Sequence, residues 1–326
     1  MIQILAGLAA VVVLFFLVVI IWDVNRFVTI EYRIPCKGLK KSYCFVMLSD
    51  LHNKQFGEHN SRLLAAVDGC RPDSVLVAGD MLTSQTSGSF VPALETVKAL
   101  AGKYPVYYAN GNHEYRLKMD TYKYKNRYQD YAEQLRRAGV VLLENQSVSL
   151  PGAGIRVYGV EINMDYYQKL HRRDMKVSYL DSLLGRPSPG EYNILIAHNP
   201  DYFQAYAGWG ADLVLSGHVH GGIMRLPVLG GVLSPALRLF PKYDGGLYVE
   251  AKRSTEAKHS MEAKHSTEAK RSTDAERSTQ TGHAGNAMEE NSRMILGRGL
   301  GTHTLPIRVF NPGELIVVRL DPERGS

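Results

Sequence analysis

Apolar and polar positions alternate along most of this chain in short runs typical of strands and helices that follow one another. Compact runs rich in β-branched residues predict strands, and apolar residues spaced three or four apart predict helices. The predicted strands cover residues 28–34, 43–48, 74–78, 106–109, 140–143, 155–161, 193–197, 212–215, 306–310 and 314–320, and the predicted helices cover residues 61–69, 91–100 and about 119–137. This order predicts a layered α/β fold.

The first 22 residues differ from the rest because they carry no charged side chain. An apolar run of this length is sufficient to cross a bilayer as a helix. A cleaved signal peptide is the alternative, but it needs a basic start, a shorter apolar stretch and a small-x-small cleavage site. No Lys or Arg precedes Asp23, and the run ends in bulky Ile-Ile-Trp. We therefore expect an uncleaved anchor over residues 1–22, with Trp22 at the membrane interface, followed by a juxtamembrane segment and first strand over residues 23–42.

The side of the membrane follows from the charges that flank this run. Positive side chains lie only on its C-terminal flank, at Arg26, Arg33, Lys37, Lys40 and Lys41. By the positive-inside rule this bias favours a cytoplasmic location for the chain that follows residue 22. Close to the apolar run, Asp23 and Glu31 offset the charges of Arg26 and Arg33. The side of the membrane therefore stays open.

A low-complexity segment interrupts the α/β pattern. From Glu250 five near-copies of a six-residue unit follow one another, with six acidic and seven basic side chains over residues 250–279. Alanine is the only apolar residue that recurs, so the segment has little to bury and is predicted to be disordered. We expect residues 250–292 to be an insertion at a hairpin tip, between strands at residues 247–249 and 293–296. The folded domain then comprises residues 43–249 and 293–322.

Composition adds little to this interpretation. With 45% hydrophobic and 21% charged residues among 326, the chain is ordinary for a globular protein. The net charge of +6 is spread along the chain, which favours anionic partners weakly and does not indicate nucleic acid.

Tyr124, Tyr128 and Tyr131 fall on one face of the predicted helix 119–137, which favours packing over stacking on bases. The three cysteines lack metal-site spacing and are predicted to be unpaired thiols.

Side chains that bind metals follow the predicted strands. They are Asp50, His52, Asp80, Asn112, His198, His218 and His220. Asp50 and His52 stand two residues apart, so strand alternation would direct both to one side while Leu51 faces the core. A carboxylate has two oxygens, so Asp80 is able to bridge two metals.

The charge of such a centre indicates its chemistry. Two divalent ions against two carboxylates leave about two positive charges, which attract a phosphate ester and lower the pKa of a bridging water. We therefore predict that the resulting hydroxide attacks a phosphate ester and hydrolyses it.

The order D-x-H, GD, GNHE, H and GHVH resembles the calcineurin-like metallophosphoesterase superfamily. It is especially similar to the bacterial membrane-anchored branch of phosphodiesterases related to UDP-diacylglucosamine pyrophosphatases. The match covers about residues 28–250 and resumes at Arg293. The resemblance implies a four-layer αββα sandwich with metals at the C-terminal ends of its strands.

The resemblance also implies a role for each residue. Asp50, His52 and His220 would hold the first metal, Asp80 would bridge, and Asn112, His198 and His218 would hold the second. His113 would contact the phosphate and protonate the leaving oxygen. Glu114 replaces the commoner Asp and is expected to orient a histidine from behind the ligands. His303 is expected to approach the metals from the far end of the chain.

These observations support two hypotheses. The first is a membrane-anchored two-metal phosphohydrolase that acts on a phosphodiester, a phosphomonoester or a pyrophosphate, with a lipid-linked substrate suggested by the anchor. The second is a non-catalytic, membrane-anchored binder of phosphorylated ligands. The presence of His113 with every ligand favours the enzyme. Mixed nitrogen and oxygen ligands suit Mn, Fe or Zn, and the physiological substrate and oligomeric state stay open.

Overall fold

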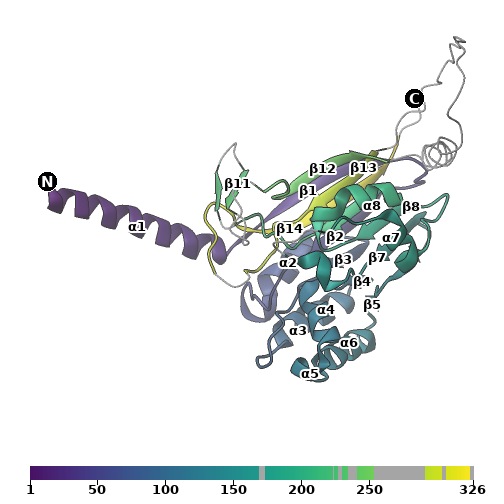
Figure 1. Cartoon of the computed structure of the whole chain (residues 1–326), viewed down its shortest axis with the longest axis horizontal. Helices are drawn as coiled ribbons and strands as arrows, with labels where there is room; N and C mark the ends of the chain where they lie inside the picture. Colours follow the sequence, from purple (N-terminus) through teal and green to yellow (C-terminus); the bar gives the residue numbers. More distant parts are fainter. Residues whose placement is uncertain are drawn as a thin grey trace, which may run out of the picture.

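Two six-stranded sheets form the body of the protein, seen here in a computed structural model (Figure 1). The structure describes residues 1–168, 173–222, 224–226, 230–233, 241–252, 291–302 and 306–323. The first sheet has the order β1 (Phe27–Cys36), β14 (Gly313–Pro322), β2 (Tyr43–Leu48), β3 (Ser74–Ala78), β4 (Val106–Ala109) and β5 (Val141–Leu142). The second has the order β12 (Gly246–Ala251), β13 (Asn291–Leu296), β9 (Leu213–Ser216), β8 (Tyr192–Ile196), β7 (Ile155–Gly159) and β6 (Gln146–Leu150).

The two sheets pack face to face around an apolar core. Phe45 and Met47 of β2 meet Ile194 and Ile196 of β8 in this layer, and all four are at most 1% exposed. Because side chains alternate along a strand, Val46 of β2 faces the other way, toward the helices. The inner core therefore joins the sheets, and each sheet keeps an outer face to be covered.

Helices cover both outer faces. The first sheet is covered by α2 (Ser61–Cys70), α3 (Val91–Ala101), α4 (Asn112–Met119), α5 (Thr121–Tyr124) and α6 (Arg127–Arg137). The second is covered by α7 (Val177–Leu184) and α8 (Phe203–Trp209). The predicted four-layer αββα sandwich is thus confirmed. Short elements complete it, namely η1 (Glu58–Asn60), η2 (Met164–Tyr167), η3 (Pro200–Tyr202) and the hairpin β10 (Met224–Leu226) with β11 (Gly230–Leu233).

The apolar N-terminal run forms one helix, α1 (Ile2–Val24), which projects away from the sandwich (Figure 1). Its 23 residues span about 35 Å at 1.5 Å per residue, enough to cross a bilayer. The apolar stretch of this helix is 0% buried within the protein. Near the end of the helix, however, Asp23 is buried (2% exposed) and accepts hydrogen bonds from the Arg26 side chain and from the backbone amide of Asn311.

The single helix predicted over residues 119–137 is wrong. Asp120 accepts a hydrogen bond from the Lys123 amide (3.1 Å) and so starts a new helix, and Lys125 adopts a left-handed backbone (φ 56°) that ends it. Two short helices, α5 and α6, therefore replace the predicted one from Thr121 onward, and Met119 belongs to the preceding helix α4. The expected packing of the three tyrosines is confirmed, since each is at most 4% exposed.

The strand predicted over residues 306–310 is also wrong. Only Val309 makes a bridge, to Met224. The neighbouring Arg308 is 2% exposed, and its guanidinium donates to backbone carbonyls that include those of Gly299 (3.1 Å) and Asn311 (3.1 Å). A buried arginine that binds this many carbonyls requires an irregular loop instead of a strand.

The hairpin predicted around the repeat segment is confirmed. Strands β12 and β13 pair antiparallel from Gly246–Leu296 to Ala251–Asn291. Each strand extends two residues into the predicted insertion. The repeats themselves and the disorder predicted for them lie outside the described residues. All three cysteines are free thiols, as predicted.

Candidate metal centre

The first part of the centre lies in two turns that follow β2 and β3. The Asp50 amide donates to the Gly79 carbonyl (3.0 Å), and the His52 amide donates to the Asp80 carbonyl (3.1 Å). Asp50, His52 and Asp80 all have left-handed backbones, with φ of 51°, 48° and 54°. The prediction that strand alternation brings Asp50 and His52 together therefore gives the wrong reason, because both lie beyond the strand in a turn. Leu51 between them is fully buried, as predicted.

The second part comes from the other sheet. His198 follows β8, while His218 and His220 follow β9 with φ of 75° and 53°. The His218 amide donates to Asp50 Oδ1 (3.0 Å), so the two sets of turns are joined directly. In total five of the seven predicted ligands have left-handed backbones. Each costs about 1 kcal/mol or more, and such conformations gather where the surrounding structure enforces a functional geometry.

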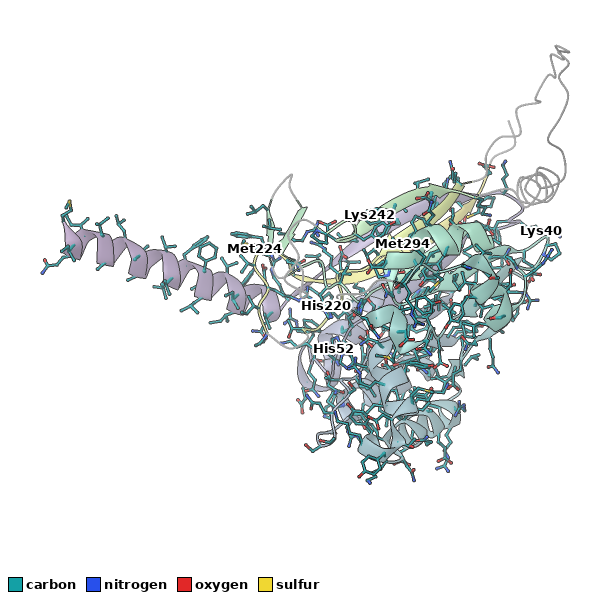
Figure 2. The ribbon with its side chains drawn as sticks, in the orientation of Figure 1. Lys40, His52, His220, Met224, Lys242 and Met294 are labelled. Atoms are coloured by element: carbon teal, nitrogen blue, oxygen red, sulfur yellow. The ribbon has the colours of Figure 1, made fainter. Side chains whose placement is uncertain are left out.

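The structure brings the predicted side chains together. Asp50, His52 and His220 form one group, and Asp80, His198 and His218 form another, with the ligand atoms of each within 4.8 Å of one another. Among the closest pairs are His52 Nε2 and His220 Nε2 (3.2 Å), and His198 Nε2 and Asp80 Oδ2 (3.0 Å). His52 and His220 lie on the side of the sandwich nearest α1 (Figure 2).

Two buried oxygen atoms in the centre lack a hydrogen-bond partner in the described part of the chain. They are Asn112 Oδ1 and Asp50 Oδ2. Buried polar atoms are seldom left unpaired, because each costs free energy that an added ligand would recover. Two carboxylates, one amide oxygen and several imidazoles form a donor set that fits divalent Mn, Fe or Zn.

The pKa values of the predicted ligands agree with a site for divalent cations. Burial raises the pKa of Asp50 to about 6. Although burial opposes a charged imidazole, the Asp80 and Asp50 carboxylates raise the pKa of His198 to about 10. Burial likewise acts against ionised Asp80, but the His198 and His113 rings hold the pKa of that carboxyl well below its usual range. The site thus stabilises positive charge between its two carboxylates.

His113 lies beside the ligand groups with a fixed tautomer. Its Nδ1 atom accepts a hydrogen bond from the Ser84 amide (2.8 Å), so the neutral ring carries its proton on Nε2. That Nε2 is 4.0 Å from Asp80 Oδ2, and His113 forms a further close group with His52 and Asp80. Ser84 Oγ also contacts Nδ1 (2.9 Å) and accepts from Arg116 (3.0 Å).

Glu114 differs from the expectation that it orients a histidine. Its buried carboxylate accepts from the amides of Asp80 (2.9 Å), Met81 (2.9 Å) and Gly111 (3.0 Å), and from the Tyr108 hydroxyl (2.7 Å). Burial raises the pKa of Glu114 to about 7. These partners hold the turn that carries Asp80, so Glu114 orients the carboxylate that is predicted to be a ligand.

Two glycines permit the close approach of these turns. A Cβ on Gly111 would lie 2.2 Å from Asp80 Oδ1, and a Cβ on Gly217 would lie 2.3 Å from Asp50 Oδ2. Both distances are far below van der Waals contact. Any other residue at either position would displace the neighbouring carboxylate.

The C-terminal loop supports the centre in a way that the sequence motifs do not indicate. Asn311 is fully buried, and its side-chain amide donates to the carbonyls of His220 (2.8 Å) and Gly222 (2.7 Å). The Gly301 amide donates to the Asp50 carbonyl (2.7 Å). The glycines near Leu300 and the Asn-Pro-Gly turn were the signals available for this loop. His303, expected to approach the metals, lies outside the described residues.

A four-layer αββα sandwich with this centre at the ends of its strands defines a calcineurin-like phosphoesterase, a class of metal-dependent phosphoesterases. The family model described as calcineurin-like phosphoesterase matches residues 45–222, which is more than half of the chain. The chain therefore belongs to this family.

Three relatives illustrate the match. An uncharacterized metallophosphoesterase of Campylobacter jejuni, Cj0846, is 29% identical over 60% of this chain and 48% of its own length. The phosphodiesterase YaeI of Escherichia coli is 26% identical over 58% of this chain and 65% of its own length. A transmembrane protein with a metallophosphoesterase domain from Danio rerio is 26% identical over 63% of this chain and 47% of its own length. The chain thus spans about half to two thirds of the length of these curated relatives.

Proposed function

We propose that this protein is a membrane-anchored phosphohydrolase that uses two divalent metal ions. One observation carries the proposal: two groups of ligand atoms lie side by side, and Asp80 belongs to the second group while also lying close to His52 and His113. A carboxylate in that position suits a bridging ligand between two ions.

Each group would hold one ion. Asp50, His52 and His220 are proposed to hold the first, with Asp80 bridging, and Asn112, His198 and His218 are proposed to hold the second. When bound, two divalent ions activate water as a nucleophile near neutral pH and stabilise the charge on the phosphate. Asp50 and Asp80 offset only about two of four positive charges, so the occupied centre favours a phosphate anion.

His113 is proposed as the proton donor to the leaving oxygen. The Ser84 amide fills its Nδ1 acceptor, which supports a ring whose Nε2 proton faces the centre. A positioned donor of this kind contributes about 10²- to 10⁴-fold to the rate. The same Nε2–H would also orient a phosphate oxygen in the bound substrate.

The substrate is proposed to be a phosphodiester, a phosphomonoester or a pyrophosphate, with a lipid-linked molecule favoured. The favouring observation is the short connection between α1 and the centre. Asp23 of α1 accepts from the Asn311 amide (3.0 Å), and the Asn311 side chain donates to the His220 carbonyl (2.8 Å). A centre this close to the end of an apolar helix is suited to a headgroup at the membrane surface.

The membrane side is part of the proposal. The positive residues after α1 favour a cytoplasmic catalytic domain, although Asp23 and Glu31 reduce the bias. A cysteine-accessibility assay on intact cells would test it with a reporter cysteine placed at exposed Tyr122. Labelling from outside the cell would contradict a cytoplasmic domain.

The experiment that tests the function is a substrate screen with the full-length protein in detergent and added manganese. An artificial phosphodiester, a phosphomonoester and a lipid pyrophosphate are compared. Turnover that falls by at least about 100-fold in His113→Ala supports catalysis. Binding of the same compounds without turnover would favour the alternative, a non-catalytic binder.

A further inference from the structure

A groove lies between the end of α1 and the start of α2. It encloses about 470 Å³ and is lined by Val18, Ile21, Trp22, Asn25, Arg26 and Arg62. One wall is the last turns of the apolar helix, and the other is the first turn of α2. None of these residues belongs to the proposed metal centre.

The apolar wall is open. Val18, Ile21 and Trp22 are 57%, 64% and 67% exposed, so the protein itself leaves this side of α1 uncovered. Trp22 is the residue that we expect at the membrane interface, where its amphipathic ring is favoured. The groove would therefore open at the level of the lipid headgroups.

The polar wall carries a surplus of positive charge. Arg26 is paired with the buried Asp23, at 3.0 Å and 2.8 Å, so its charge is offset. Arg62 is exposed and makes no ion pair within the residues that the structure describes. Lys54 adds a second cation beside the groove, because its ammonium donates to Asn25 Oδ1 (2.9 Å).

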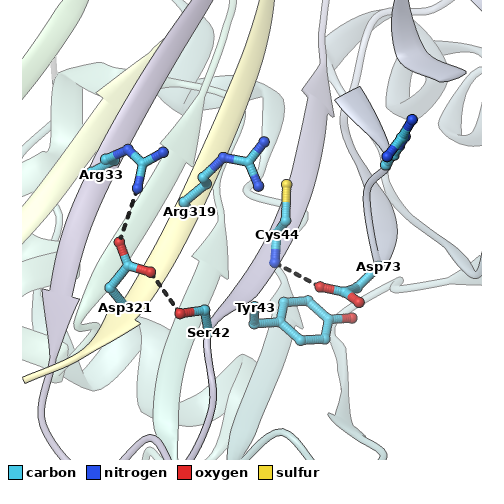
Figure 3. Close-up of a pocket in the computed structure, with 8 residues that line it drawn as sticks. Arg33, Ser42, Tyr43, Cys44, Asp73, Arg319 and Asp321 are labelled. Carbon is cyan, nitrogen blue, oxygen red and sulfur yellow. Dashed lines mark hydrogen bonds and ion pairs between the residues drawn. The ribbon is translucent and has the colours of Figure 1, made fainter. Parts of the chain in front are cut away.

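A second cavity makes the contrast clear. It encloses about 360 Å³ against the outer face of the first sheet, and Arg33, Arg319 and Cys44 line it (Figure 3). Two of the three arginines that line it have acidic partners, since Arg33 lies 3.7 Å from Asp321 and Arg319 lies 3.2 Å from Glu31. The lining also includes two carboxylates, those of Asp73 and Asp321, which would repel an anion. In the groove at α1, no acidic residue is part of the lining, and Arg62, which has no ion pair among the described residues, stands beside an apolar wall.

We propose that this groove binds one anionic phospholipid of the surrounding bilayer, with its phosphate at Arg62 and an acyl chain along Val18 and Ile21. A guanidinium matches two phosphate oxygens at once. An anionic lipid keeps a net negative charge there, whereas a zwitterionic lipid brings its own cation close to Arg62 and Lys54. The bound lipid would fasten the start of α2 and the loop after His52 to the membrane surface. This inference rests on the membrane anchoring of the proposed function.

Trp22 offers a direct test because it lines the groove. The only other tryptophan, Trp209, is 4% exposed and donates its indole hydrogen to the Gly185 carbonyl (2.8 Å). The full-length protein is placed in nanodiscs of unlabelled phosphatidylcholine that contain an equal small fraction of one brominated lipid. The brominated lipid is either phosphatidylglycerol or phosphatidylcholine, and quenching of tryptophan fluorescence is measured.

We expect quenching by brominated phosphatidylglycerol to reach half its maximum at about fivefold lower lipid fraction than quenching by brominated phosphatidylcholine, as one unpaired arginine at the surface predicts. Arg62→Gln should abolish the difference. Arg71→Gln, at the other end of the same helix and also exposed, should leave it unchanged.

Each other outcome overturns a distinct claim. Equal quenching by the two brominated lipids would overturn the lipid site and leave the membrane anchor intact. A preference that survives Arg62→Gln would also overturn the site, since it would reflect general enrichment around α1. Quenching by neither lipid would overturn the membrane anchor itself, and the lipid site with it.

Discussion

The Nδ1 atom of His198 donates a hydrogen bond across 2.6 Å to the backbone carbonyl of Ala78. His198 follows a strand of the second sheet, and Ala78 is the last residue of β3 in the first. Because a carbonyl only accepts, this bond fixes the proton on Nδ1 and directs Nε2 toward Asp80 Oδ2, 3.0 Å away. One contact therefore joins the two sheets and orients a proposed ligand at the seam between them.

The affinity for metal should depend on pH. Metal binding must displace the proton of His198, whose pKa is raised to about 10, and below pH 6 also that of Asp50, whose pKa is raised to about 6. Affinity for Mn²⁺ should therefore rise about tenfold per pH unit between about pH 6 and pH 10, and fall more steeply below about pH 6. Calorimetric titration of metal-free protein at several pH values checks this. An affinity that stays level between about pH 6.5 and 8.5 would rule out proton displacement from His198.

Gly217→Ala should disable the first proposed metal position. Its Cβ would lie 2.3 Å from Asp50 Oδ2, so the carboxylate must move. We expect loss of one of the two bound metal ions and a fall in turnover of at least about 10-fold, with the fold retained. Gly69→Ala is the matched control, because its Cβ would meet no atom within 4 Å. Metal analysis by mass spectrometry gives the answer, and full metal content in Gly217→Ala would refute the steric argument.

Ser84→Ala should reduce catalysis through His113. The substitution removes a hydroxyl that contacts His113 Nδ1 (2.9 Å) and accepts from Arg116 (3.0 Å), but it keeps the backbone donor. We expect kcat to fall about 10-fold with little change in KM, since the ring loses orientation while the ligands are untouched. Steady-state kinetics checks this, with Ser87→Ala, an exposed serine on the same loop, as the control. A change confined to KM would show that Ser84 acts on substrate binding instead.

Deletion of the repeats should leave activity unchanged. Strands β12 and β13 pair up to Ala251 and Asn291, so the hairpin is complete without residues 253–290. Replacing those residues by Asn-Gly leaves Lys252-Asn-Gly as a three-residue hairpin loop, a length that antiparallel strands accept. We expect turnover and melting temperature to match those of the intact protein. A large loss of either would mean that the repeats contribute to the domain.

The sequence predicts the strands around the centre well because their apolar runs are compact and end at polar ligands. It fails over residues 119–137, where an amphipathic pattern continues through two breaks. Those breaks depend on the Asp120 side chain and on the left-handed Lys125, and neither interrupts the spacing of apolar residues.

The ligands themselves are foreseeable from residue type and order, but their geometry is not. Alternation along a strand suggests a common side for Asp50 and His52, whereas left-handed turns bring them together. The contribution of Asn311 is invisible in the sequence because it depends on a contact with His220, 91 residues away. Long-range contacts of this kind require the folded chain.

Metal-dependent turnover of an artificial phosphodiester tests the central claim most directly. The full-length protein is stripped of metal, reloaded stepwise with Mn²⁺ and compared with Asp80→Asn and with Asp68→Asn, whose partly exposed carboxylate pairs with Lys103. We predict no turnover without metal, full turnover at about two ions per chain and a loss of at least about 100-fold in Asp80→Asn, with Asp68→Asn unaffected. Undiminished turnover by Asp80→Asn, or turnover by the metal-free protein, would contradict a two-metal phosphohydrolase.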